Sequence, residues 1–453
     1  MRVVIIGGVA AGAKAAAKTK RILPNAIVEI YTKDTHVSYS ACGIPYYVQG
    51  NFEDYNKLII RTPEKFKEDG IDIFLKKEVI KINPNKKEIV VLDLETNNAS
   101  NVKYDKLVIA TGAHPIIPQI KNVHLKNIFT LRTLKDAITV REKLRQSKNA
   151  VIIGGGYIGL EMLEAFVANN VKTTLVETSS FIMPNLDIEL AKLVQEYVLN
   201  YKPEYTDIIN NEHITEFIGE EKIEYVKTES GRIIPTDFIL LCAGIKPSVE
   251  IATAAGIKLG KTGAIKVNNQ METNIKDIYA CGDCIEEMYL LTHTPVWMPL
   301  GSNANKEGRC AAINLSGGTD YFEGVLGSNV TKYFGLTISM TGFTEKKAKE
   351  LGFNTISLTV TKRDKAGYMP EVENVTIKLV VDRQTHKLLG GQAIGCGDAD
   401  KRINTLSTAL LKQMTVEDLA GADLTYSPAF STSIDPLISV ARLIIEKLKM
   451  DFD

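Results

Sequence analysis

One short run of the sequence has the residue types for thiol chemistry. It reads Ser38-Tyr39-Ser40-Ala41-Cys42-Gly43-Ile44-Pro45-Tyr46-Tyr47 and contains a single cysteine. Gly43 and Pro45 predict a loop that enters a helix, where backbone N–H groups and the helix dipole favour a thiolate. We therefore expect Cys42 to be redox-active near neutral pH. The alternative is a buried structural cysteine, which is the usual situation for an arbitrary cysteine.

A glycine-rich loop, Gly7-Gly8-Val9-Ala10-Ala11-Gly12, precedes this run. The β-branched segment 3–6 predicts a strand before the loop and the alanine-rich segment 13–22 predicts a helix after it, which is the context of a dinucleotide-binding fingerprint. Val9 replaces the middle glycine of that fingerprint. Thr32 stands where an acidic ribose ligand is expected. The loop still predicts a first nucleotide site.

A second fingerprint, Gly154-Gly155-Gly156-Tyr157-Ile158-Gly159, is complete. It lies between a predicted strand, 150–153, and a predicted helix. Glu177 closes the next predicted strand, at the offset from which a carboxylate accepts hydrogen bonds from a ribose 2′-hydroxyl and repels a 2′-phosphate. No arginine follows to bind such a phosphate, so we expect NADH to be preferred over NADPH.

Two later motifs complete the pattern: Ala110-Thr111-Gly112-Ala113 after a buried strand, and Ile278-Tyr279-Ala280-Cys281-Gly282-Asp283. With the two loops and the Cys42 run, they resemble the pyridine nucleotide-disulfide oxidoreductase family over essentially the whole chain. The resemblance implies an FAD enzyme that carries electrons from a nicotinamide through the flavin to sulfur.

The resemblance also implies the cofactor ligands. Asp283 would bond the ribityl hydroxyls, Tyr157 would cover the flavin until the nicotinamide displaces it, and Glu161 would contact the nicotinamide. The expected FAD ligands are Gly7, Val9, Ala10, Ala11, Gly12, Thr32, Lys33, Thr111, Gly112, Arg132, Asp283 and Ala304. The expected NAD ligands are Gly154, Gly156, Tyr157, Ile158, Gly159, Glu161, Glu177 and Gly244.

The Cys42 run is similar to that of the single-cysteine branch of the family, because Tyr47 replaces the second cysteine of lipoamide dehydrogenase. This branch contains coenzyme A-disulfide reductase, persulfide and polysulfide reductases, NADH oxidase and NADH peroxidase. Ser38 and Cys42 are the expected catalytic pair of this segment. Cys42 would alternate between a thiolate and a mixed disulfide, a persulfide or a sulfenic acid.

The loop residue Ala10 helps to separate these activities. Oxidases and peroxidases of the family typically carry a histidine there, so thiol–disulfide or persulfide chemistry is favoured. Coenzyme A disulfide is the leading expected substrate, with persulfide or polysulfide close behind. The alternatives are an NADH oxidase or peroxidase that uses a Cys42 sulfenate, and a flavoprotein reductase that passes electrons to a small redox protein.

Basic residues on the first predicted helix indicate where such a substrate would bind. Lys14, Lys18 and Arg21 lie at i, i+4 and i+7 and therefore share one face. In coenzyme A-disulfide reductases the corresponding face holds the nucleotide end of the coenzyme, and Arg21 is the best match. Asn305 is expected to join this substrate site. The alternative is a solvated helix face, since most charge stripes are only that.

Two tyrosines in the last third of the chain are further catalytic candidates. Tyr368 and Tyr426 match tyrosines that, in coenzyme A-disulfide reductases, reach the active sulfur of the other subunit. There they would donate hydrogen bonds or protons to a leaving thiolate. The alternative is packing in a subunit interface. This match implies a homodimer.

Composition restricts the partners. Lys and Arg together number 54, as do Asp and Glu, which removes the electrostatic case for nucleic acid or an anionic membrane. Six cysteines at unpaired spacings predict a reducing, cytoplasmic location rather than a disulfide framework. Cys281 and Cys284 have a C-x-x-C spacing, but no second cysteine or histidine pair accompanies them, so we expect no metal.

The predicted fold class is α/β, with two Rossmann-like domains, one inserted in the other, and a C-terminal α+β dimerisation domain. The expected FAD domain comprises 1–113 and 243–322, and the inserted NAD(P)H domain comprises 114–242. The interface domain is expected at 323–453. Within it the sequence predicts strands near 330–334, 337–341, 355–361, 376–381 and 388–394, and a helix over 401–414.

Overall fold

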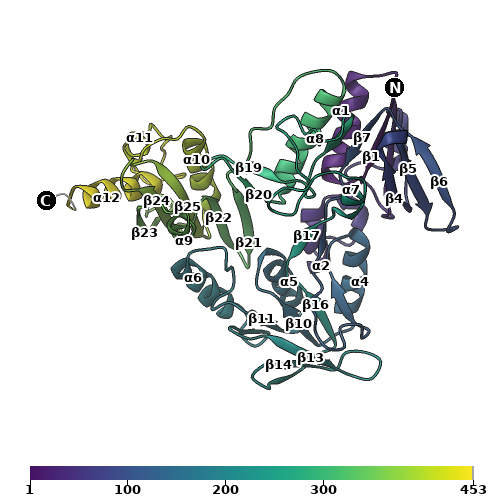
Figure 1. Ribbon diagram of the computed structural model, residues 1–453. Helices are drawn as coiled ribbons and strands as arrows, with labels where there is room; N and C mark the ends of the chain where they lie inside the picture. The colour runs from purple at the N-terminus through teal and green to yellow at the C-terminus, as the bar shows by residue number, and fades with distance from the viewer. Residues whose placement is uncertain (451–453) are drawn as a thin grey trace.

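Figure 1 shows the computed structural model of the protein, which describes residues 1–450. The last three residues of the predicted interface domain lie outside this range. Three five-stranded sheets, each flanked by helices, form the scaffold. The first two are parallel and the third is antiparallel. The predicted α/β class with two Rossmann-like domains and a C-terminal α+β domain is confirmed.

The first sheet has the order β18-β7-β1-β2-β3. Its members are β1 (Arg2–Ile6), β2 (Ile27–Tyr31), β3 (Ile71–Phe74), β7 (Lys106–Ile109) and β18 (Ile278–Ala280). β18 comes from far along the chain and pairs with β7, so the segment between them is an insertion. An antiparallel sheet of β4 (Lys77–Asn83), β5 (Glu88–Asp93) and β6 (Ala99–Lys103) adjoins it.

Helices α1 (Ala10–Ile22) and α8 (Gly301–Leu315) lie side by side on this domain (Figure 1). Their contact is close because a Cβ atom added to Gly308 would lie 2.3 Å from the carbonyl oxygen of Ala11. Glycine at this position therefore brings the start of α1 against α8. Two short helices, α2 (Ile44–Gln49) and α3 (Pro63–Glu68), lie between β2 and β3 in the sequence.

The second sheet has the order β12-β11-β10-β16-β9. Its members are β9 (Ile128–Thr130), β10 (Asn149–Ile153), β11 (Lys172–Val176), β12 (Thr206–Ile209) and β16 (Phe238–Leu241), with helices α4 (Leu134–Leu144), α5 (Tyr157–Ala168) and α6 (Ile188–Leu199). The chain enters this domain through β8 (Ala113–Pro115) and leaves it through β17 (Ile245–Pro247). These two strands pair antiparallel, so the two connections run side by side.

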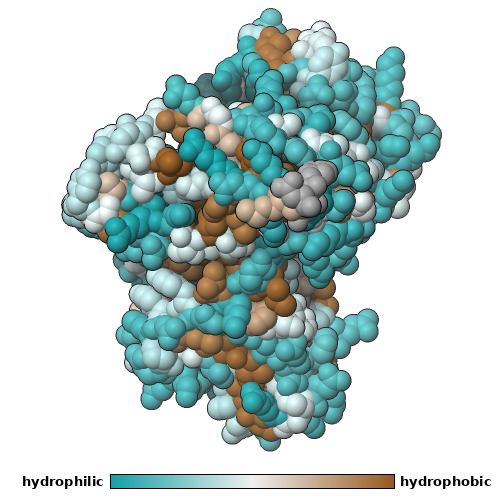
Figure 2. Space-filling view, turned by 90° about the vertical axis from the view of Figure 1, so that its left-hand side faces the viewer, coloured by the Kyte–Doolittle hydropathy of each residue, from teal (hydrophilic) through white to brown (hydrophobic). Residues whose placement is uncertain are grey.

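The third sheet has the order β21-β22-β25-β24-β23. Its members are β21 (Asn329–Tyr333), β22 (Leu336–Gly342), β23 (Thr355–Arg363), β24 (Asn374–Asp382) and β25 (Leu388–Gly395), with helices α9 (Glu345–Glu350), α10 (Ala399–Leu411), α11 (Val416–Ala420) and α12 (Pro436–Met450). The predicted helix over 401–414 thus ends at Leu411. Figure 2, which views the molecule from the side of this domain in Figure 1, shows apolar areas among polar surface.

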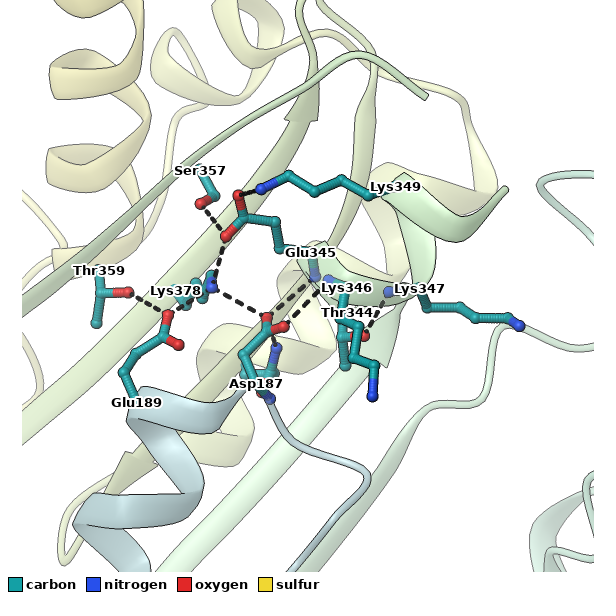
Figure 3. Close-up of polar contacts among 11 residues, drawn as sticks. Asp187, Glu189, Thr344, Glu345, Lys346, Lys347, Lys349, Ser357, Thr359 and Lys378 are labelled. Carbon is teal, nitrogen blue, oxygen red and sulfur yellow. Dashed lines mark hydrogen bonds and ion pairs between the residues drawn. The ribbon is translucent and has the colours of Figure 1, made fainter. Parts of the chain in front are cut away.

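A buried ion cluster joins the second and third domains (Figure 3). Lys378 of β24 is 3% exposed and its Nζ lies 3.2 Å from Asp187, 2.5 Å from Glu189 and 2.8 Å from Glu345. Asp187 also accepts hydrogen bonds from the backbone N–H groups of Glu345 and Lys346 at the start of α9. Burial lowers the pKa of Lys378, but the three carboxylates raise it by more, so that the pKa lies above that of an ordinary lysine. Lys378 is therefore a buried cation that anchors the inserted domain.

Candidate active site

A cavity of about 970 Å³ follows the length of α1. At the start of the helix it is lined by Val9, Ala10, Ser38 and Cys42, and at the end by Lys20 and Arg21. The helical rise from Ala10 to Arg21 is about 16 Å. The cavity therefore extends from a thiol to a group of cations.

Cys42 lies in a 3₁₀ turn, Ala41–Gly43, that leads into α2. A Cβ atom added to Gly301 would lie 3.9 Å from its Sγ, so the start of α8 stands next to the sulfur. Burial, Glu161 and Asp283 raise the pKa of the Cys42 thiol, and Arg132 lowers it less. The expectation that the local helix favours the thiolate is wrong. The turn and the six-residue α2 form a short dipole, and two carboxylates oppose it.

Ser38 lines the same cavity. Its φ of +51° is in the left-handed region, which is uncommon for a residue with a side chain. Its backbone N–H donates to the carbonyl oxygen of Gly8 at 2.7 Å, and Ile60 donates to the Ser38 carbonyl at 2.8 Å. These bonds hold the segment before Cys42 against the first glycine loop.

The first glycine loop has the shape of a nucleotide cradle. A Cβ atom added to Gly7 would lie 2.1 Å from the carbonyl oxygen of Ala110, and one added to Gly12 would lie 2.0 Å from that of Gly7. Gly7 also has a φ of +100°. No side chain fits at either position. α1 begins directly after Val9, so its free N–H groups suit a pyrophosphate, as an FAD site requires.

The structure gives partners to the expected adenosine ligands. Thr32 is buried and its Oγ1 accepts from the N–H of Asp34 at 3.2 Å. Lys33 is exposed, with its Nζ 3.7 Å from Glu78. The Thr32 hydroxyl remains a possible donor to a ribose oxygen.

Five expected FAD ligands come together beside the Cys42 segment. Arg132 Nη2 and Asp283 Oδ2 form an ion pair at 2.6 Å. A Cβ atom added to Gly112 would lie 3.5 Å from the same Arg132 nitrogen. Thr111 donates its hydroxyl to the carbonyl oxygen of Ser248 at 2.6 Å. Ala304 lines a small cavity together with Asp283.

The second glycine loop repeats the geometry of the first. A Cβ atom added to Gly154 would lie 2.4 Å from the carbonyl oxygen of Cys242, and one added to Gly159 would lie 2.0 Å from that of Gly154. Glu177 is 6% exposed and accepts from the N–H groups of Gly155, at 2.6 Å, and Ser179, at 2.7 Å. The carboxylate therefore holds the loop at the position where a ribose is expected.

Other expected NAD ligands lie around this loop. Gly156 and Ile158 flank Tyr157 at the start of α5, and Gly156 has open space where a Cβ would stand. Gly244, with a φ of +99°, lies at the return connection, where an added Cβ would lie 3.6 Å from Ile116. Glu161 is one turn into α5. Burial raises its pKa to about 7, and the nearby charge of Glu164 adds to this effect.

Tyr157 has partners that no sequence motif indicated. Its hydroxyl donates to Asn329 Oδ1 at 2.8 Å and accepts from Asn185 Nδ2 at 2.6 Å. Burial raises the pKa of Tyr157 to about 12. Since Asn329 begins β21, the ring is held between the second and third domains. A single asparagine in a distant segment carries no pattern that predicts this contact.

The cation end of the cavity differs from the predicted stripe. Lys14, Arg21 and Asn305 line the cavity, but Lys18 does not. The lining face of α1 turns towards Ala13, Ala17 and Lys20, so Lys18 falls on its far edge. Lys20, Arg61 and Lys65 were missed. The latter two come from the segment around α3, which no periodicity in α1 could indicate.

Tyr368 and Tyr426 do not line the cavity of their own chain. They are 77% and 53% exposed, on the third domain. Phe430, close to Tyr426 in sequence, is 65% exposed. Their exposed side chains are accessible to another molecule.

The remaining cysteines are unpaired. All six are free thiols in the described part of the chain. Burial raises the pKa values of Cys281 and Cys284. Within residues 1–450 no group of three or more potential ligand side chains is arranged for a metal ion, and no helix is both long and apolar enough to cross a bilayer.

Comparison with known proteins agrees with this architecture. Residues 1–308 match the family model described as pyridine nucleotide-disulphide oxidoreductase, and residues 328–437 match the dimerisation domain of that family. The solved structure of a NAD-dependent persulfide reductase from A. fulgidus superposes with a TM-score of 0.96 at 33% identity, covering 99% of this chain and 84% of that one.

Three curated relatives align over almost their whole length. The NAD(P)H coenzyme A polysulfide/persulfide reductase of Pyrococcus horikoshii is 36% identical, covering 98% of each chain. An NADH oxidase of Methanocaldococcus jannaschii is 31% identical, covering 99% of each. The coenzyme A disulfide reductase of Staphylococcus epidermidis is 30% identical, covering 95% of this chain and 96% of that one. With two glycine cradles and one thiol beside them, the protein belongs to the pyridine nucleotide-disulphide oxidoreductase family.

Proposed function

We propose that this protein uses NADH and bound FAD to reduce a coenzyme A-linked disulfide or persulfide through Cys42. The observation that carries the proposal is the cavity along α1, which joins one thiol to several cations. A substrate with a sulfur at one end and phosphates at the other matches both ends. The coenzyme A relatives support this choice by their names.

The cations at the far end are arranged for an anion. Burial lowers the pKa of Arg61, and the charge of nearby Arg21 lowers it further. Arg61 also pairs with Asp69 and lies over the ring of Phe66. Two neighbouring guanidinium groups repel each other, and bound phosphate would relieve that repulsion. Lys14 adds a third positive charge to the lining.

FAD would supply two-electron transfer between NADH and sulfur when bound at the first glycine cradle. The bond changes on this chain involve only Cys42. Its thiolate attacks one sulfur of the substrate disulfide, an S–S bond to Cys42 forms, and the first thiolate leaves. Two electrons then break the new S–S bond, so Cys42 returns to the thiolate and the second thiolate leaves.

The homodimer completes the site in this proposal. Tyr368 and Tyr426 are exposed on the domain that matches the dimerisation model. From a second copy, their hydroxyls would donate a proton to the leaving thiolate next to Cys42. Because the pKa of the Cys42 thiol is raised, its thiolate is disfavoured, and hydroxyl donors next to it would stabilise the negative charge on its sulfur.

NADH preference and a cytoplasmic location belong to the same proposal. Buried Glu177 lies beside the second cradle and would repel a 2′-phosphate. Six free thiols fit a reducing compartment. An NADH oxidase is the second candidate, because one relative carries that name, but Ala10 at the cavity wall offers no imidazole for oxygen chemistry.

The test is mass spectrometry of native Cys42 combined with turnover of coenzyme A disulfide by NADH. We expect an added coenzyme A or an added sulfur on Cys42, and loss of turnover in Cys42→Ser with flavin reduction by NADH retained. Cys396→Ser is the matched control, because Cys396 is the other exposed cysteine and lies outside the cavity. Full turnover in Cys42→Ser would refute the proposal, and an added oxygen with NADH oxidation by O₂ would select the oxidase.

A further inference from the structure

Two buried carboxyl groups lie directly behind the Gly282-Asp283 turn. Glu287 is the first residue of β19 (Glu287–Tyr289) and Glu307 is on α8. They are 6% and 1% exposed. Among the residues that the structure describes, neither has an ion-pair partner, which is unusual because buried carboxylates are almost always paired.

Each carboxyl group holds one backbone N–H. Glu307 Oε2 accepts from Gly282 at 2.7 Å, and Glu287 Oε2 accepts from Met298 at 2.9 Å. Within residues 1–450, Glu287 Oε1 is buried and receives no hydrogen bond. The two side chains are within hydrogen-bonding range of each other. Such a bond requires a proton on one of them.

The negative charge nearby favours retention of that proton, and one cation opposes it. Asp283, on the turn, adds negative charge to both groups, and Cys281 lies near Glu307 as a neutral buried thiol. Lys306 on α8 opposes this effect only for Glu307. Burial and the Glu307 charge raise the pKa of Glu287 to about 10, and burial also raises the pKa of Glu307.

The pair touches the parts that would contact FAD. Gly282 has a φ of +82°, and a Cβ added there would lie 2.9 Å from the Cβ of Ala11 in the first cradle. Asp283 follows, held through its carbonyl by Trp297 Nε1 at 2.8 Å. Met298 is in the segment that leads into α8. One hydrogen-bonded pair therefore connects the turn, the segment before α8 and α8 itself.

We propose that Glu287 and Glu307 share a single proton at neutral pH and act as a positioning pair that holds the Gly282-Asp283 turn and the start of α8 in the arrangement that binds FAD. This inference rests on the proposed FAD site. It assigns a role to two residues that contact neither the reacting sulfur nor the nucleotide cradles.

The proton held by the pair makes the stability of the fold depend on pH. A carboxyl group whose pKa rises from 4.5 in the unfolded chain to about 10 on folding keeps a proton that the unfolded chain releases. Stability therefore falls as pH rises through this window, by about tenfold in the folding equilibrium constant per pH unit.

Glu307→Gln removes the need for the proton without removing the bonds. Its amide oxygen would accept from Gly282, and its NH₂ group would donate to an ionised Glu287. We compare urea unfolding of the full-length wild type and variant at pH 6 and pH 8. From pH 6 to pH 8 the folding equilibrium constant of the wild type should fall by up to about 100-fold more than that of Glu307→Gln. Parallel profiles would overturn the proposal.

Flavin retention gives the second readout. Dialysis at pH 8 should remove FAD faster from Glu307→Ala than from wild type, while Glu307→Gln retains it. Equal retention in Glu307→Ala would overturn the positioning role. If Glu307→Gln does not fold, Glu287→Gln makes the mirrored exchange, accepting from Met298 and donating to Glu307. A wild type that never binds FAD would contradict the proposed function instead, because the unfolding profile does not depend on turnover.

Discussion

The pKa of the Cys42 thiol is raised by burial and by side chains that lie far from it in the sequence. The adjacent Gly43 and Pro45 predict a helix start, and a helix does start there, but it is six residues long. Glu161 and Asp283, brought in by α5 and by the turn after β18, oppose ionisation of the thiol. Sequence motifs single out Cys42, because one thiol stands in a distinctive run. They do not give its pKa, which depends on burial and on charges from other domains.

Glu161→Gln should make Cys42 more reactive towards alkylation. Glu161 has a pKa of about 7 and is ionised above that value, where it raises the pKa of the thiol. Without this charge, iodoacetamide should modify Cys42 about threefold faster at pH 8, because more of the thiol is ionised. Mass spectrometry of the modified peptide over time gives the rate. Glu164→Gln on the same helix is the control, and an unchanged rate in Glu161→Gln would contradict the assignment.

At the level of elements, α1 supplies one wall of the cavity and α3 with its flanking segments supplies the other. The sequence predicts the glycine loops and the strands before them closely, because hydrophobic runs next to glycines are strong local signals. β1 and β10 each begin one residue before the predicted strand and end where it does. The sequence does not predict Arg61 and Lys65, because their approach to Arg21 depends on how α3 packs. Lys18 shows the limit of an i, i+4 argument, since a 40° rotation decides whether a side chain enters a cavity.

Removing positive charge from the cation end of the cavity should weaken binding of the substrate without changing the reaction with NADH. Arg21→Met and Arg61→Met should each raise the KM for coenzyme A disulfide about tenfold, since a charge-assisted contact is worth about 1.5–3 kcal/mol. Flavin reduction by NADH in a stopped-flow experiment should keep its rate. Lys18→Met removes a cation from the same helix outside the cavity and should change neither quantity. A KM that rises as much in Lys18→Met would mean that only the general field of the helix matters.

For the whole molecule, the main feature is how the inserted domain is fixed. It is attached covalently through β8 and β17 and electrostatically through Lys378, which sits among three carboxylates (Figure 3). Insertion of one domain in another follows from the order of motifs and was predicted. The anchor was not, because Asp187, Glu189 and Lys378 look like ordinary surface charges when read singly. Only tertiary packing buries Lys378 and Asp187 together and places the exposed Glu189 beside them.

Lys378→Met should destabilise the protein strongly. Loss of the cation leaves Asp187 and Glu189 without their shared partner, and breaking a buried pair by removing one member costs about 3–5 kcal/mol. Urea unfolding at pH 7 would measure the loss in free energy of unfolding. Lys347→Met, which removes an exposed lysine paired with Glu350 at 3.3 Å, should cost below about 1 kcal/mol. Equal effects would show that the cluster contributes nothing beyond surface charge.

The antiparallel ribbon formed by β8 and β17 has a consequence for how enzymes of this architecture change their coenzyme. Since the two ends of the inserted domain meet at Ala113–Pro115 and Ile245–Pro247, the whole unit between them forms a cassette with neighbouring entry and exit points. Such a cassette is suited to replacement in one piece, because its junctions need no new geometry. Nicotinamide specificity and sulfur chemistry can then evolve, or be engineered, on separate segments. The replacement domain must supply carboxylates that pair with Lys378, as Asp187 and Glu189 do here.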